Sequence, residues 1–306
     1  MYNEQHLKNI FIQGDLKKAM DYIERYHEDP SAIEKYHALF KRKEFIQLSE
    51  DPAMDNLLMP YQLYFHDVFY DGVETKIAEE YLRERLSTLL GSKNLPMEVL
   101  EEQLKVIIEA QDYYFLGGKS NGYYGPYVWK SKEVVTYSVE LPDTTEDFEI
   151  FILDGFITRS WMDYISFGLA GTGGWAQANG AICCIRDRYD FESESFKVSL
   201  LKHEAQHSLD LRKYEGITNA ELEYRAKLVE LIYSNELSIL GNFYERAKST
   251  QINEGHVQAS VKIKEAFNHR FFEEEINDID GVYDLNGIQV FARQLFQESN
   301  EVLDFK

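Results

Sequence analysis

Apolar residues in the first third of the chain recur at the spacing of amphipathic helices. Between residues 9 and 26 they fall three to five positions apart, and the same spacing returns between residues 97 and 114. Prolines at positions 30, 52, 60 and 96 interrupt these stretches, as do glycines at positions 72 and 91. The pattern predicts helices and turns up to about residue 118, without a repeat long enough for a helical solenoid.

The middle of the chain has a different pattern. A stretch rich in Gly, Asn and Tyr (116–127) reads as a linker, and short runs of β-branched and aromatic residues follow it. These runs predict strands: YVWKSKEVVTYSVEL (127–141), DFEIFILDGF (147–156) and GAICCIRD (180–187). Helical spacing resumes at residue 195, with breaks expected near Gly216, Gly241, Gly255 and Gly281. This order of elements, helices first and then strands followed by helices, predicts an α+β chain. We expect an all-helical domain at 1–118 and a second domain at 119–306.

Composition narrows the possible partners and the location. The chain carries 53 acidic and 32 basic side chains, a net charge of -21. The negative electrostatic potential of such a chain repels phosphate backbones and anionic lipids, so we expect neither nucleic acid nor a membrane as a partner. The N-terminus lacks a signal-peptide core, and no apolar run approaches the ~20 residues of a membrane span. We expect a cytoplasmic protein in which the adjacent Cys183 and Cys184 are small buried hydrophobes.

Two segments near the predicted strands need a choice between interpretations. The loop FGLAGTGGWAQANG (167–180) suggests a phosphate cradle, but alanine stands where the third glycine is needed and a strand follows instead of a helix. We therefore expect a flexible loop leading into a strand. The strand GAICCIRD is either a sheet edge that pairs with an extended peptide or a buried central strand.

Candidate chemistry lies in LLKHEAQHSLDL (200–211), on a helix predicted from Ser195 to Tyr214 with Ser193 or Ser195 as the N-cap. His203 and His207 stand one turn apart on one face, so both imidazoles can bind a single zinc ion. Glu204 is displaced sideways and can take a proton from a metal-bound water. The alternative is that both histidines are ordinary helix residues.

A zinc hydrolase needs a third protein ligand. The metzincin continuation is excluded, because Asp210 and Lys213 replace the required glycine and histidine. On the next helix Glu221 and Glu223 are about 200° apart, so only one of them can face the histidines. Helical periodicity places Glu221 on the inward side of this helix. The small Ala226, one turn after Glu223, would instead let the two helices approach closely on the side of Glu223. We favour Glu223, with Asp210 a distant third.

The motifs HEAQHSLD and TNAELEYRA together resemble gluzincin-type zinc metallopeptidases, and look most like lethal-factor-like peptidase domains. Those domains carry HExxHxxD and then a helix whose glutamate is followed three positions later by a small residue, a form that Glu223 and Ala226 match. The resemblance does not reach the N-terminal half. It implies a zincin-like catalytic domain in which His203, His207 and Glu223 hold Zn²⁺. It also implies that Glu204 is the general base and that Tyr214 stabilises the oxyanion, although the spacing of Tyr214 is not identical.

The expected function is zinc-dependent hydrolysis of a peptide or protein substrate. The alternative is a catalytically silent zincin-like binding or regulatory protein with a helical interaction module, and retention of Glu204 argues against it because a structural zinc site has no use for a free base. His256 could be an electrophilic helper near the site, but we expect a surface histidine after a glycine turn, and we expect His269 to be a packed or exposed helix residue. Asp210 either hydrogen-bonds a ligating imidazole or solvates the helix, and we favour the hydrogen bond. Cleavage specificity and oligomeric state do not follow from the sequence.

Overall fold

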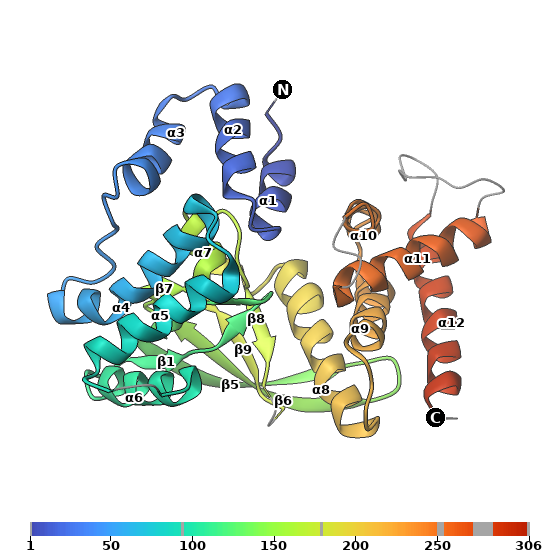
Figure 1. Cartoon of the computed structure of the whole chain (residues 1–306). Coiled ribbons are helices and arrows are strands. Elements are labelled where there is room, and N and C mark those ends of the chain that lie inside the picture. The colour runs from blue at the N-terminus through green and yellow to red at the C-terminus, as the bar shows by residue number, and fades with distance from the viewer. Residues whose placement is uncertain (1, 93–94, 178–179, 250–253, 272–283, 305–306) are drawn as a thin grey trace. The chain divides into compact units, whose positions relative to one another are not determined.

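The computed structural model describes residues 2–92, 95–177, 180–249, 254–271 and 284–304. Helices predominate and the sheets are small, as the α+β prediction requires (Figure 1). Contacts divide the chain into two compact units, Met1–Ser131 with Leu153–Thr172 and Lys132–Ile152 with Gly173–Lys306. The boundary proposed at 118/119 thus falls inside the first unit, because the short strands at Tyr114–Leu116, Tyr127–Trp129 and Thr158–Arg159 pair with one another there.

The first unit is mainly helical. Its small antiparallel sheet has the order β1(Tyr114–Leu116)-β4(Tyr127–Trp129)-β7(Thr158–Arg159), and a two-stranded ribbon joins β2(Lys119–Ser120) to β3(Tyr123–Tyr124). The stretch 9–26 forms two helices rather than one, because Gly14 adopts a left-handed φ of 73° and Asp15 then caps the second helix. The helices are α1(Glu4–Ile12), α2(Leu16–Tyr26), α3(Ser31–Tyr36), α4(Pro52–Phe65), α5(Thr75–Leu89), α6(Met97–Glu109) and α7(Ser160–Ser166), with π-helical turns at His37–Lys41 and His66–Asp71.

The second unit contains a four-stranded sheet of order β5(Ser131–Glu140)-β6(Thr145–Asp154)-β9(Ile182–Ile185)-β8(Gly174–Ala176). All four residues of β9 are buried, so GAICCIRD supplies a central strand and not the sheet edge. Within the described residues the edge strands of this sheet are β5 and β8, and β8 lies inside the Gly-rich segment that was expected to be a flexible loop. Cys183 and Cys184 are buried and unbridged, as predicted, and burial raises the pKa of both thiols to about 12.

Helices cover the rest of the second unit. They are a π-helix at Ser195–Lys202 that continues directly into α8(His203–Lys213), then α9(Asn219–Tyr233), α10(Ser238–Arg246), α11(Gly255–Phe271) and α12(Leu285–Asp304). The predicted break at Gly241 is wrong, because this glycine lies inside α10, where buried Leu240 and Phe243 offset its cost of about 1 kcal/mol. Gly216 and Gly255 do mark helix boundaries, and Gly281 lies outside the described residues.

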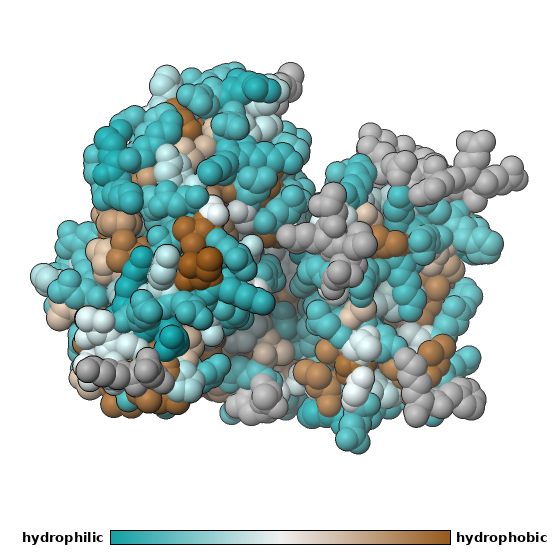
Figure 2. Space-filling model, in the orientation of Figure 1, coloured by the Kyte–Doolittle hydropathy of each residue, from teal (hydrophilic) through white to brown (hydrophobic). Residues whose placement is uncertain are grey.

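Helix α9 is the central helix of this unit and packs against α8, α11 and α12. Ten consecutive residues, from Glu223 to Ile232, are buried, so α9 has no solvent-facing stripe over this length. Among the described residues no helix is long and apolar enough to cross a membrane. Hydrophilic residues cover most of the face shown in Figure 2, with hydrophobic ones in small separate groups.

Candidate metal centre

Helix α8 presents His203 and His207 to α9. The two rings are one turn apart, with centroids 4.6 Å from each other and planes nearly perpendicular. Both Nε2 atoms approach the carboxylate of Glu223. His203 Nε2 lies 3.5 Å from Oε2, and His207 Nε2 lies 3.3 Å from Oε1. The structure thus brings together the three residues that the sequence nominated as ligands, and all three are buried.

The spacing of these atoms fits a shared metal ion. Ligand atoms about 2.1 Å from a tetrahedral zinc ion are separated from one another by about 3.4 Å. The observed distances of 3.3 and 3.5 Å match that value. Glu223 Oε2 is also buried, and its nearest polar neighbours in the described part of the chain are the imidazole nitrogens of His256 and His203, so the buried carboxylate needs a proton or a metal cation beside it. Two imidazoles and a carboxylate suit zinc, although other divalent transition metals accept the same donors.

The electrostatics of the cluster call for a cation. Burial alone raises the pKa of the Glu223 carboxyl, but His203, His207 and His256 outweigh it and hold that pKa well below its usual range. Burial lowers the pKa of His203, whereas Glu223 and Glu230 together raise it to about 10. Without a metal, a proton on His203 balances part of the charge of the buried carboxylates. A divalent ion can take the place of that proton.

Glu230 fixes the orientation of one imidazole. Its Oε1 lies 2.7 Å from His203 Nδ1, which turns Nε2 of the same ring toward Glu223. A carboxylate behind a ligating histidine orients the ring and makes it a more basic ligand. This contact of Glu230 was not predicted from the sequence. The available signal was spacing, since Glu230 follows Glu223 by seven residues and so lies two turns further along the same face.

Glu204 stands beside the cluster without belonging to the ligand set. Its Oε2 accepts a hydrogen bond of 2.9 Å from the backbone N–H of Ala176, at the edge strand β8. Among the described residues Oε1 has no hydrogen-bond partner. Strand β8 can pack closely against Cys183 of β9 and against Leu200 only because residue 174 is a glycine. A Cβ at this position would lie 2.3 Å from the carbonyl oxygen of Cys183 and 2.6 Å from the side chain of Leu200.

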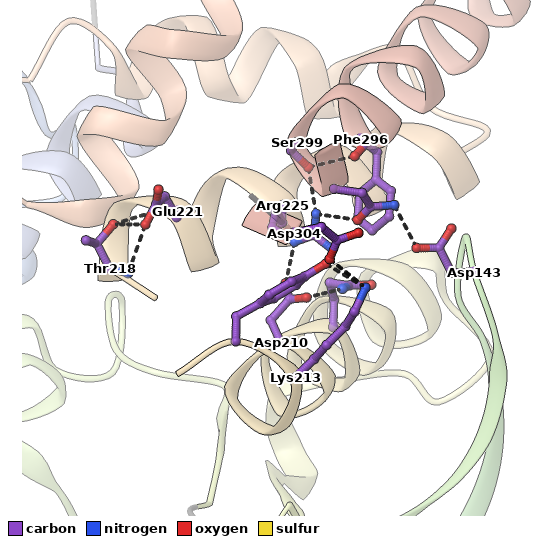
Figure 3. A network of polar contacts seen from close by, with 12 residues as sticks. Asp143, Asp210, Lys213, Thr218, Glu221, Arg225, Phe296, Ser299 and Asp304 are labelled. Carbon is purple, nitrogen blue, oxygen red and sulfur yellow. Dashed lines mark hydrogen bonds and ion pairs between the residues drawn. The ribbon is translucent and has the colours of Figure 1, made fainter. Parts of the chain in front are cut away.

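Glu221 and Asp210, the other candidates for third ligand, have different partners (Figure 3). Glu221 forms a capping box with Thr218 at the start of α9. Asp210 accepts hydrogen bonds from Arg225 Nε at 2.8 Å and from Gln206 Nε2 at 2.9 Å. Both oxygens of Asp210 are therefore occupied, and the expected hydrogen bond to a ligating imidazole is not made.

Tyr214 lies at the far end of α8 from His203. It is the C-cap residue, about 10 Å along the axis from His207. Its hydroxyl accepts a hydrogen bond of 2.7 Å from Lys213, and the guanidinium of Arg225 lies 5.4 Å from its ring centroid. No contact joins Tyr214 to the three metal-ligand candidates in the described part of the chain.

His256 reaches the cluster from α11. Its Nδ1 lies 2.6 Å from Glu223 Oε2, and its ring stacks with that of His203 at a centroid distance of 6.4 Å. The expectation that His256 is only a surface residue is incomplete, because the side chain is 40% exposed and also contacts a buried carboxylate. His269, on the same helix, is exposed as expected.

Comparison with protein-family models, curated proteins and solved structures gives no match to this chain. The kind of site is therefore inferred from the geometry of its residues alone. Two histidines from one helix and a glutamate from the next form a buried cluster able to hold a metal ion, and the carboxylate of Glu204, bonded to the Ala176 N–H, lies beside it.

Proposed function

We propose that the second unit is a zincin-like, zinc-dependent peptidase domain of the gluzincin type. His203, His207 and Glu223 hold the metal, and Glu204 is the general base. The observation that carries the proposal is the convergence of both Nε2 atoms on the Glu223 carboxylate, at the separations expected of zinc ligands. A purely structural zinc site would normally have a fourth protein ligand, and the residues that the structure describes supply three to this cluster.

The chain's own residues divide the chemistry between them. A zinc ion in this site would lower the pKa of a bound water to about neutral and polarise a substrate carbonyl. Glu204 Oε2 is held by the Ala176 N–H, which leaves Oε1 to take the proton from water and pass it to the leaving amine. Glu230 keeps the His203 ring in its ligating orientation. Tyr214 has no part in this scheme, because its partners belong to another network.

The edge strand β8 supports a peptide as the substrate. Gly173 O accepts a hydrogen bond from Ile185 N, and Gln177 N donates to Ala181 O, so these residues face β9. The residues between them alternate, so the backbone groups of Gly174 and the carbonyl of Ala176 face the free side of β8, where the Ala176 N–H already donates to Glu204. An extended peptide can pair with this edge, beside Glu204.

A peptide-library digest read by mass spectrometry tests the proposal. Zinc-loaded protein should release defined products, a chelator should abolish them, and added zinc should restore them. The His269→Ala variant, changed at an exposed histidine of α11, should behave like the wild type. Zinc binding without cleavage of any library peptide would contradict the peptidase proposal and favour the silent binding or regulatory protein.

A further inference from the structure

We infer that His256 is a positioning residue that holds the Glu223 carboxylate from outside the metal-ligand cluster. This inference rests on the proposed metal site but not on peptide hydrolysis. The geometry that supports it is the short contact of 2.6 Å between His256 Nδ1 and Glu223 Oε2.

Three imidazoles surround the carboxylate of Glu223. His207 approaches Oε1 at 3.3 Å and His203 approaches Oε2 at 3.5 Å, distances that suit ligands of a common ion. The third contact, from His256, has the length of a hydrogen bond and not of a ligand pair. His256 is also absent from the set of residues whose ligand atoms all lie within 4.8 Å of one another. It therefore acts on the metal only through Glu223.

The backbone explains why His256 reaches this position. Helix α11 begins at Gly255, where a Cβ would lie 2.3 Å from Asn219 Nδ2 and 3.3 Å from the Asn219 carbonyl carbon. The missing side chain lets the first residue of α11 pack against the first residue of α9. Glu223 follows Asn219 by one helical turn on the same face of α9, so the next residue of α11, His256, meets Glu223.

A fixed carboxylate is a better ligand than a mobile one. A glutamate can turn about its last side-chain torsion and present either oxygen or both. Contact between His256 and Oε2 restricts that rotation, so the entropy of ordering the ligand is lost on folding and not on metal binding. Partners behind metal ligands typically contribute 10- to 100-fold in affinity. The side chain is 40% exposed, so its removal opens the site to water and leaves no sealed cavity.

The test measures zinc affinity by competition with a chromophoric chelator. His256→Ala should bind zinc about 10- to 100-fold more weakly than the wild type. His256→Asn should recover most of that loss, because an amide nitrogen can occupy roughly the place of Nδ1 and donate to Oε2. His269→Ala is the matched control on the same helix and should bind zinc like the wild type. Circular dichroism and urea unfolding of each variant should match those of the wild type.

The outcomes separate this inference from the proposed function. If wild-type affinity persists in His256→Ala, or if His256→Asn binds as weakly as His256→Ala, the positioning role is wrong. A wild-type protein that binds no zinc overturns the metal site and this inference together. If the wild type binds zinc and cleaves no peptide, the peptidase proposal fails, and the predicted order of affinities still supports the role of His256.

Discussion

Glu204→Gln is expected to keep its zinc and lose about 10²- to 10⁴-fold in the rate of peptide cleavage, the usual contribution of a general base. The amide cannot take a proton from water at neutral pH. The substitution preserves the size of the side chain, and the amide oxygen can still accept the hydrogen bond from Ala176 N–H. Because Glu204 lies outside the His203, His207 and Glu223 cluster, metal binding should not change.

The measurement is zinc content and the cleavage rate of one peptide selected from the library. Glu221→Gln is the control, since it changes a carboxylate that serves the capping box of α9 and not the metal centre. Loss of zinc in Glu204→Gln would make Glu204 a ligand. An unchanged cleavage rate would remove it as the base.

The second large effect concerns stability. Asp210→Ala is expected to lower the free energy of unfolding by about 3–5 kcal/mol, because it leaves the Arg225 guanidinium buried without its counter-ion. Asp210 is 0% and Arg225 2% exposed, and their contact is 2.8 Å. Arg225 also donates to Ser299 and Asn300, so it links α8, α9 and α12 through one side chain (Figure 3).

Urea unfolding of four proteins tests this expectation. The double variant Asp210→Leu/Arg225→Met should lose less stability than Asp210→Ala alone, because no unpaired charge stays buried. Glu192→Ala, which removes an exposed ion pair with Lys197, should cost less than about 1 kcal/mol. If Asp210→Ala also lowers the free energy of unfolding by less than about 1 kcal/mol, the buried pair does not hold these helices together.

The paired histidines could be predicted from the sequence because their contact is local. Residues four apart on any helix share a face, so the positions of His203 and His207 need no tertiary information. Within α8 the burial of the last turn does not follow hydropathy, since Leu211 is exposed while Asp210 is buried.

The third ligand shows where helical periodicity fails. A helical wheel assumes one buried and one exposed face, and it favoured Glu221. Helix α9 is instead buried around its whole circumference from Glu223 onward, so its apolar stripe does not mark the direction of the metal site. The small residue at position 226 was the better guide, because it concerns the approach of a neighbouring helix.

Two parts of the site required the tertiary structure. His256 meets Glu223 only because α11, which begins at Gly255, packs there against the start of α9 at Asn219. Glu204 meets Ala176 only because a Gly-rich segment pairs with β9 as an edge strand. Neither pairing leaves a periodic signal in the sequence, since each depends on which elements pack together.

The most direct measurement is the zinc content of the purified protein after metal removal and reloading, compared across single variants. We predict one zinc per chain in the wild type and in Glu221→Ala. We predict a large loss in His203→Ala, His207→Ala and Glu223→Ala, because each removes one of the three proposed protein ligands. Undiminished zinc in the histidine variants would contradict the metal centre, and loss in Glu221→Ala with retention in Glu223→Ala would contradict the assignment of its third ligand.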